Sequence, residues 1–151
     1  MSGCRGENRM GIIQKYKQNI FNDYSSFGLE SFFDQSGREI WFEYEEDSSS
    51  PLYLFYKGNC IGKMLFSIQD DYIELWDIIV FDRKPQIRNS GIGSWMFTKL
   101  KEIAINQNLK GIKGKMVPEN SEDWQELVKF YKKQGCLVED GWFEYWFDNN
   151  N

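Results

Sequence analysis

The stretch RNSGIGSWMFTKLKEIAIN, residues 88–106, decides how this chain folds. It begins with small residues and two glycines, and apolar side chains then recur at helical spacing over residues 91–108. The stretch therefore predicts a glycine turn that opens an amphipathic helix. The apolar stripe of that helix is predicted to contain Trp95, Met96, Leu100, Ile103 and Ala104.

Strand patterns precede this helix, and strands alternate with a second helix after it. Period-two alternation and turn residues predict four consecutive antiparallel strands, at 39–45, 52–56, 60–68 and 72–81. After the helix we predict a strand at 111–117, a helix at 121–134 and a strand at 142–147. The second helix has an apolar stripe of Trp124, Leu127, Val128 and Tyr131. Residues 12–33 have roughly helical spacing and predict one or two short N-terminal helices.

These elements together predict an α+β chain with a mixed, α/β-type sheet. We expect N-terminal helices, a mostly antiparallel central sheet of six to seven strands, and flanking helices. The passage from 72–81 through the helix to 111–117 predicts one parallel pair, joined by a right-handed crossover.

Length and composition predict one domain over residues 1–151, in which the N-terminal segment 1–37 has no assigned role. The chain has 151 residues, of which 41% are hydrophobic and 17% aromatic, which is enough for a sizeable core. No apolar run reaches the roughly 18 residues that span a bilayer, and the first residues lack a signal-peptide pattern. We therefore expect a cytoplasmic protein without membrane association.

The absence of histidine excludes imidazole triads and histidine-ligated zinc, and we predict no metal site. Cys4, Cys60 and Cys136 are odd in number and far apart, so a disulfide framework is not expected. The net charge of −5 argues against nucleic acid as a partner. Residues 82–133 nevertheless carry an excess of basic side chains, which either attract a phosphorylated ligand or form a solvated helix face.

The glycine turn is the motif that predicts chemistry. In Arg88-Asn89-Ser90-Gly91-Ile92-Gly93, glycines let the backbone approach a ligand, and the helix start offers unpaired amides with partial positive charge. This is a pattern for binding a diphosphate, although an ordinary glycine turn gives the same string.

Two other nucleotide-binding patterns do not fit this sequence. A Rossmann fingerprint needs a third glycine where Met96 stands, and four antiparallel strands before the motif contradict that fold. A P-loop needs Ser or Thr after Gly-Lys, but Met64 and Met116 follow the two Gly-Lys pairs.

Residues 38–147 resemble the GNAT superfamily of acyl-CoA-dependent N-acyltransferases. The resemblance rests on the strand 72–81, the motif 88–93 opening a helix, the strand 111–117 with Asn120 after it, and the ending Phe130-Tyr131-Lys132-Lys133-Gln134-Gly135. In this superfamily the strands equivalent to 72–81 and 111–117 splay apart, and thioester and amine meet in the gap. Arg83 and Cys136 depart from the family pattern, which usually has an aliphatic and an aromatic residue there.

The resemblance implies a set of cofactor-binding residues. Main-chain groups of Phe81 and Arg83 would bind the pantetheine arm of CoA, and Asn120 would contact the cofactor near it, unless Asn120 only serves the turn. The amides of the glycine turn would bind the diphosphate; these belong to Arg88, Asn89, Ser90, Gly91, Ile92, Gly93 and Ser94.

The resemblance also implies the catalytic residues. Tyr131 would donate a proton to the leaving thiolate, or it would simply complete the apolar stripe of its helix. Asp77 would accept the proton of the amine directly or through water, with Glu74 as the second candidate. Because strand residues alternate between faces, only one of these two carboxylates should line the site. Either one is otherwise a solvated surface group, and water alone is a further option for the base.

The function implied is transfer of an acetyl group from acetyl-CoA to a primary amine of a small molecule, peptide or protein, by direct attack. Acidic and aromatic residues around Trp41, Glu43 and Tyr44 would suit a cationic acceptor, or they form a solvated strand face. Two alternatives remain open: a CoA-binding regulatory module without turnover, and an interaction protein that forms a homodimer through residues 142–147.

Overall fold

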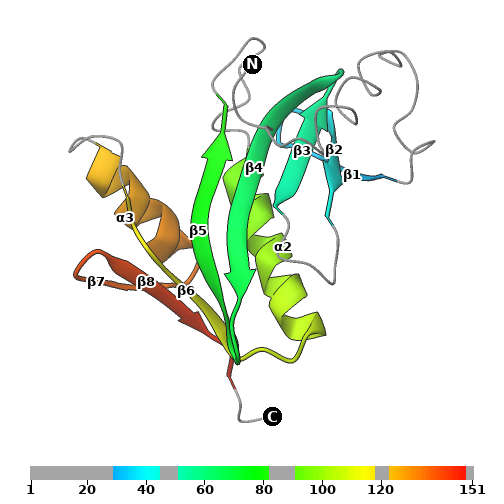
Figure 1. Ribbon diagram of the computed structural model, residues 1–151. Coiled ribbons are helices and arrows are strands. Elements are labelled where there is room, and N and C mark those ends of the chain that lie inside the picture. The colour runs from blue at the N-terminus through cyan, green and yellow to red at the C-terminus, as the bar shows by residue number, and fades with distance from the viewer. Residues whose placement is uncertain (1–28, 45–50, 82–90, 118–122, 149–151) are drawn as a thin grey trace. The chain divides into compact units, whose positions relative to one another are not determined.

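Figure 1 shows the computed structural model of the chain, in which residues 29–44, 51–81, 91–117 and 123–148 are described. The elements are β1 (Glu30–Phe33), β2 (Glu39–Glu43), β3 (Leu52–Tyr56), β4 (Asn59–Ile68), β5 (Tyr72–Val80), α2 (Ile92–Asn106), β6 (Gly111–Lys115), α3 (Asp123–Lys133), β7 (Leu137–Glu139) and β8 (Trp142–Trp146). The hydrogen-bonded order of the strands is β1-β2-β3-β4-β5-β6-β8-β7. The α+β class with a mixed sheet is thereby confirmed, and β5 and β6 form the predicted parallel pair.

The sheet has eight strands, so the prediction of six to seven was wrong at two short elements. Residues 30–33 were predicted to be helical, but they form β1, which pairs antiparallel with β2 from Glu30↔Phe42 to Phe33↔Glu39. Strand β7 pairs with β8 over three residues and was not predicted. Both strands are too short for alternation to outweigh a competing pattern. The remaining part of the predicted N-terminal helices, 12–28, lies outside the described residues.

The chain folds as two compact units, the first formed by Met1–Leu65 and Ile78–Gly93. In this unit β2 pairs with β3, and β3 pairs with β4 with a register shift at Leu54/Phe55. A core cluster of Leu29, Tyr53, Phe55 and Cys60 has Trp41 and Phe81 packed against it. Cys60 is disulfide-bonded, so the expectation drawn from cysteine number and spacing was wrong at this residue.

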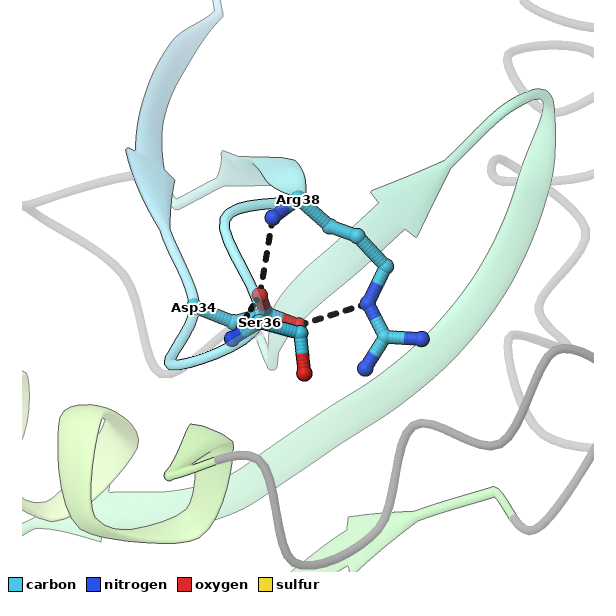
Figure 2. A network of polar contacts seen from close by, with 3 residues as sticks. All are labelled: Asp34, Ser36 and Arg38. Carbon is cyan, nitrogen blue, oxygen red and sulfur yellow. Dashed lines mark hydrogen bonds and ion pairs between the residues drawn. The ribbon is translucent and has the colours of Figure 1, made fainter.

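The turn between β1 and β2 is organised by the side chain of Asp34 (Figure 2). One carboxylate oxygen of Asp34 accepts hydrogen bonds from the amides of Ser36 and Arg38, both at 2.9 Å. The other accepts from Arg38 Nε at 2.9 Å, and the Asp34 side chain is fully buried. Burial alone would raise the pKa of Asp34, but the hydrogen bonds and charge of Arg38 and the Ser36 amide outweigh it, so the pKa is lowered.

The second unit consists of Phe66–Asp77 and Ser94–Asn151. Here β5 pairs with β6 from Tyr72↔Gly111 to Glu74↔Lys113, and β6 pairs antiparallel with β8. Helices α2 and α3 supply Phe97 and Tyr131, which pack on the aromatic side chains of β8. The ring of Tyr131 stacks on that of Phe143 with centroids 3.8 Å apart and planes inclined by 7°.

The predicted stripe of α2 is largely confirmed, because Met96, Leu100, Ile103 and Ala104 are buried and Trp95 is partly buried. In α3, Tyr131 is buried as its pattern predicts, whereas Trp124 is 37% exposed and does not belong to the core. Neither α2 nor α3, the described helices, has the length and apolar character needed to cross a membrane.

Replacing Asp34 with Asn should lower the free energy of unfolding by about 1–3 kcal/mol at neutral pH, since the buried ion pair to Arg38 is lost. We expect Asp71→Asn, which removes the exposed ion pair to Lys110 at 3.8 Å, to change stability by less than about 0.5 kcal/mol. Urea denaturation of both variants measures the difference.

The Asp34 effect also has a defined pH dependence. A carboxyl whose folded-state pKa is lowered stabilises the protein above the ordinary pKa of 3.8 and loses this contribution as the pH falls through the lowered value. The stability gap between wild type and Asp34→Asn should therefore narrow in acid. A gap that is independent of pH, or an equal loss in Asp71→Asn, would contradict this account.

Candidate active site

The first turn of α2 carries the predicted diphosphate-binding amides. The helix begins at Ile92, so the N–H groups of Gly91, Ile92, Gly93 and Ser94 have no acceptor within the helix. No acidic residue stands in this turn, so no side-chain carboxylate competes for its positive end. Four other predicted contacts in this region, Arg83, Arg88, Asn89 and Ser90, lie outside the described residues, as does Asn120.

Gly91 combines a left-handed backbone with a close neighbour. Its φ is +85°, which favours glycine, and a Cβ at this position would lie 2.8 Å from the side-chain amide of Gln35. The β1–β2 turn therefore brings Gln35 against the glycine that precedes α2. Sequence reasoning missed Gln35, because no local pattern links two residues so far apart.

Ser94, the last of these four residues, is held from the far end of α3. The side-chain nitrogen of Gln134 donates to Ser94 Oγ at 2.9 Å, and the Gln134 residue is only 9% exposed. The main-chain carbonyl of Gln134 in turn accepts a hydrogen bond from Lys101 Nζ at 3.0 Å. The motif ending at Gly135 located Gln134 but gave no indication of this contact.

Phe81 lies at the end of β5, where the resemblance places main-chain contacts to pantetheine. Its N–H donates to the carbonyl of Ile61 in β4 at 2.9 Å. This amide is thus already hydrogen-bonded within the protein.

Tyr131 is buried in a cluster of aromatic side chains. Besides stacking on Phe143, it makes edge-to-face contacts with Phe97 and Phe130, with ring centroids 6.2 Å and 5.1 Å apart. Burial raises its pKa well above the usual value of 10.0, and electrostatic interactions with Asp77 and Cys136 raise it further. The phenol therefore stays protonated at neutral pH.

The register of the second unit separates the two candidate carboxylates. Glu74 pairs with Lys113, and Lys113 pairs with Glu144, which places these three charged residues on one face of the strands. Phe143, on which Tyr131 stacks, is the next residue along β8 and therefore faces the other side. Asp77 has the same parity as the buried Ile73 and Leu75 and is close enough to Tyr131 to raise its pKa. The arrangement favours Asp77 over Glu74.

Gly114 allows the strands behind Tyr131 to approach. A Cβ on Gly114 would lie 2.3 Å from the carbonyl oxygen of Leu75 and 2.7 Å from Cζ of Phe143. The missing side chain thus leaves room for the ring that supports Tyr131. Among the described residues, no cluster of three or more His, Cys, Asp or Glu side chains is placed to hold a metal ion.

Comparison with known proteins gives one family. Residues 17–136 match the model of the Acetyltransferase (GNAT) family. No curated protein is detectably similar in sequence.

Solved structures give the same fold at low sequence identity. The GNAT domain of S. lividans PAT has a TM-score of 0.58 at 14% identity, over 83% of this chain and 99% of that one. Arabidopsis thaliana Naa50 in complex with the bisubstrate analogue CoA-Ac-MVNAL has a TM-score of 0.52 at 17% identity, over 92% of this chain and 83% of that one. PaiA N-acetyltransferase from Thermoplasma acidophilum in complex with coenzyme A has a TM-score of 0.52 at 19% identity, over 95% of this chain and 81% of that one.

The close packing at Gly114 can be tested with a single methyl group. We expect Gly114→Ala to lower the free energy of unfolding by about 2–3 kcal/mol, because the neighbouring carbonyl and ring must move. The matched control is Gly37→Ala, where a Cβ meets nothing within 4 Å and only the φ of +83° opposes the substitution. The Gly37→Ala control should lower the free energy of unfolding by about 1 kcal/mol. Equal losses in chemical denaturation would contradict the close approach of Gly114 to Leu75 and Phe143.

Proposed function

This chain belongs to the Acetyltransferase (GNAT) family, and from that premise we propose that it transfers an acetyl group from acetyl-CoA to a primary amine. The donor is supported by the CoA and the CoA conjugate in two of the related solved structures. The acceptor is the amine of a small molecule, a peptide or a protein. A CoA-binding module without turnover has no specific observation in its favour and becomes an outcome of the experiments below.

The observation that carries this proposal is the state of Tyr131. Its phenol is buried and kept protonated by its surroundings, with the carboxylate of Asp77 nearby. A leaving thiolate needs a proton donor that is neutral at the working pH, and a tyrosine with a raised pKa meets this requirement. Asp77 can accept the proton that the attacking amine must lose.

The proposed reaction is a direct attack. The neutral amine forms a bond to the thioester carbonyl carbon, and the tetrahedral species then breaks its carbon–sulfur bond. The sulfur leaves with the proton of Tyr131, and the nitrogen gives its proton to Asp77, directly or through water. The resulting phenolate is strongly basic and recovers a proton from Asp77, so the net movement is one proton from amine to thiol.

The proposed binding mode uses the main chain of α2. The amides of its first turn and the Ser94 hydroxyl would donate to the diphosphate of CoA, and the helix dipole adds to the attraction. Main-chain donors suit a ligand that is common to many acetyltransferases, because they do not depend on which side chains surround them.

Ser94→Asp tests the diphosphate site. A carboxylate in the first turn is favourable for the helix and can still accept from Gln134, but it repels the ligand, so the Kd for CoA should rise about tenfold or more. Thr98→Asp carries the same charge one turn later at an exposed position and should change the Kd by less than about threefold. Calorimetric titration with CoA decides between them. Equal Kd values for wild type and Ser94→Asp would contradict binding of the diphosphate at this turn.

Tyr131→Phe tests the chemical step. The ring stack on Phe143 is retained, so we expect kcat for thiol release from acetyl-CoA to fall by about a hundredfold or more while CoA affinity is retained. Tyr145→Phe removes a hydroxyl from the same cluster, since Tyr145 also contacts Phe97, and should leave kcat within about twofold. The assay uses a panel of primary amines and N-terminal peptides.

The pH profile supplies a further check on Tyr131. Because its pKa is raised above 10.0, the donor is fully protonated below that pH, and activity should show no decline caused by its ionisation there. CoA binding without thiol release across the whole amine panel would favour the module without turnover.

A further inference from the structure

Gln134 stands out among the residues that the proposed reaction does not use. It is a buried polar residue at the end of α3, and its side chain reaches the first turn of α2, where Nε2 donates to Ser94 Oγ at 2.9 Å. This contact joins the helix that carries Tyr131 to the turn proposed to bind the diphosphate.

The main chain of Gln134 is fixed on both sides. Its N–H donates to the carbonyls of Phe130 and Tyr131, both at 3.1 Å, and its own carbonyl accepts from Lys101 Nζ at 3.0 Å. The ammonium of Lys101 lies 4.2 Å from the ring centroid of Tyr145 and 5.4 Å from that of Phe97. The Gln134 side chain therefore extends to Ser94 from an anchored backbone.

This hydrogen bond sets the direction of the Ser94 hydroxyl. A serine hydroxyl has one proton to donate and two lone pairs that accept. When a lone pair accepts from the amide of Gln134, the proton of Ser94 must point to another acceptor. Ser94 lies in the first turn of α2, and side chains in a helix lean toward its N-terminus, so the hydroxyl lies on the side of the unpaired amides.

We propose that Gln134 is a positioning residue for the diphosphate of acetyl-CoA, because its hydrogen bond holds the Ser94 hydroxyl as a donor toward that anion. The inference rests on the proposed acetyltransferase function and adds a residue to its binding site. Gln134 touches neither the diphosphate nor the reacting atoms and acts through Ser94.

Gln134→Glu reverses the polarity of this contact with little change of shape. A carboxylate only accepts, so the Ser94 hydroxyl must donate to it and turn its lone pairs toward the diphosphate. We expect the Kd for CoA and the KM for acetyl-CoA to rise about tenfold, with kcat at saturation within about twofold of wild type. Gln134→Met, which neither donates nor carries charge, should raise the Kd about threefold.

Acetylpantetheine, which lacks the diphosphate, separates positioning from a general structural role. Its KM in the Gln134 variants should stay within about twofold of wild type, whereas loosening of α3 would weaken both donors alike. In a Ser94→Ala background, Gln134→Met should have no further effect on CoA affinity, because the hydroxyl through which Gln134 acts is gone.

The outcomes distinguish this inference from the function on which it rests. If wild type neither binds CoA nor releases thiol, the proposed function fails. If wild type binds CoA but the Kd is unchanged in Gln134→Met and Gln134→Glu, the positioning role alone is overturned. Parallel losses for CoA and acetylpantetheine, or an undiminished effect in the Ser94→Ala background, would also overturn it and leave Gln134 as a structural link between the helices.

Discussion

The stacking of Tyr131 on Phe143 is the contact on which the second unit depends. The rings lie nearly parallel, with centroids 3.8 Å apart, and this position requires Phe143 to sit directly over Gly114. A side chain at residue 114 would press on the ring of Phe143, on which Tyr131 of α3 stacks. Phe97 then closes the cluster from α2 through edge-to-face contacts with Tyr131 and Tyr145. Packing and chemistry coincide here, because the burial that stabilises the ring also keeps the phenol protonated.

A core position for Tyr131 is therefore compatible with the proton-donor role proposed for it. The sequence left the two interpretations as alternatives, and they are compatible because a buried tyrosine stays protonated at neutral pH. Burial would raise the pKa of a carboxyl base as well, because it disfavours the charged form. Asp77 is exposed, while the buried Ile73 and Leu75 precede it with the same parity, so the strand brings a solvated carboxylate to the side of Tyr131. Glu74 is directed instead to Lys113 and Glu144 on the other face.

The sequence predicts the long elements well and the long-range contacts poorly. Strands β3, β4 and β5 and both described helices lie close to their predicted bounds, since alternation and helical periodicity are local signals. The turn at Lys57 and Gly58 and the helix stop at Gly135 have the positive φ values that turn residues favour. Strand β1 could not be predicted in this way, because four residues of ESFF become a strand only through pairing with β2. The contact of Gln35 with Gly91, and that of Gln134 with Ser94, likewise arise only when the chain has folded.

The contacts of Gln35 and Gln134 lie next to main-chain amides, and this bears on how the sequence around a diphosphate site can change. Recognition of a diphosphate by main-chain amides places few demands on side chains, so a chain can keep this function while most of its sequence changes. The neighbouring side chains then support the main-chain amides and do not replace them as hydrogen-bond donors. Gln35 lies against the glycine that precedes α2, and Gln134 orients the hydroxyl of Ser94. Both contacts join residues that are far apart in the sequence, so only the folded chain reveals them.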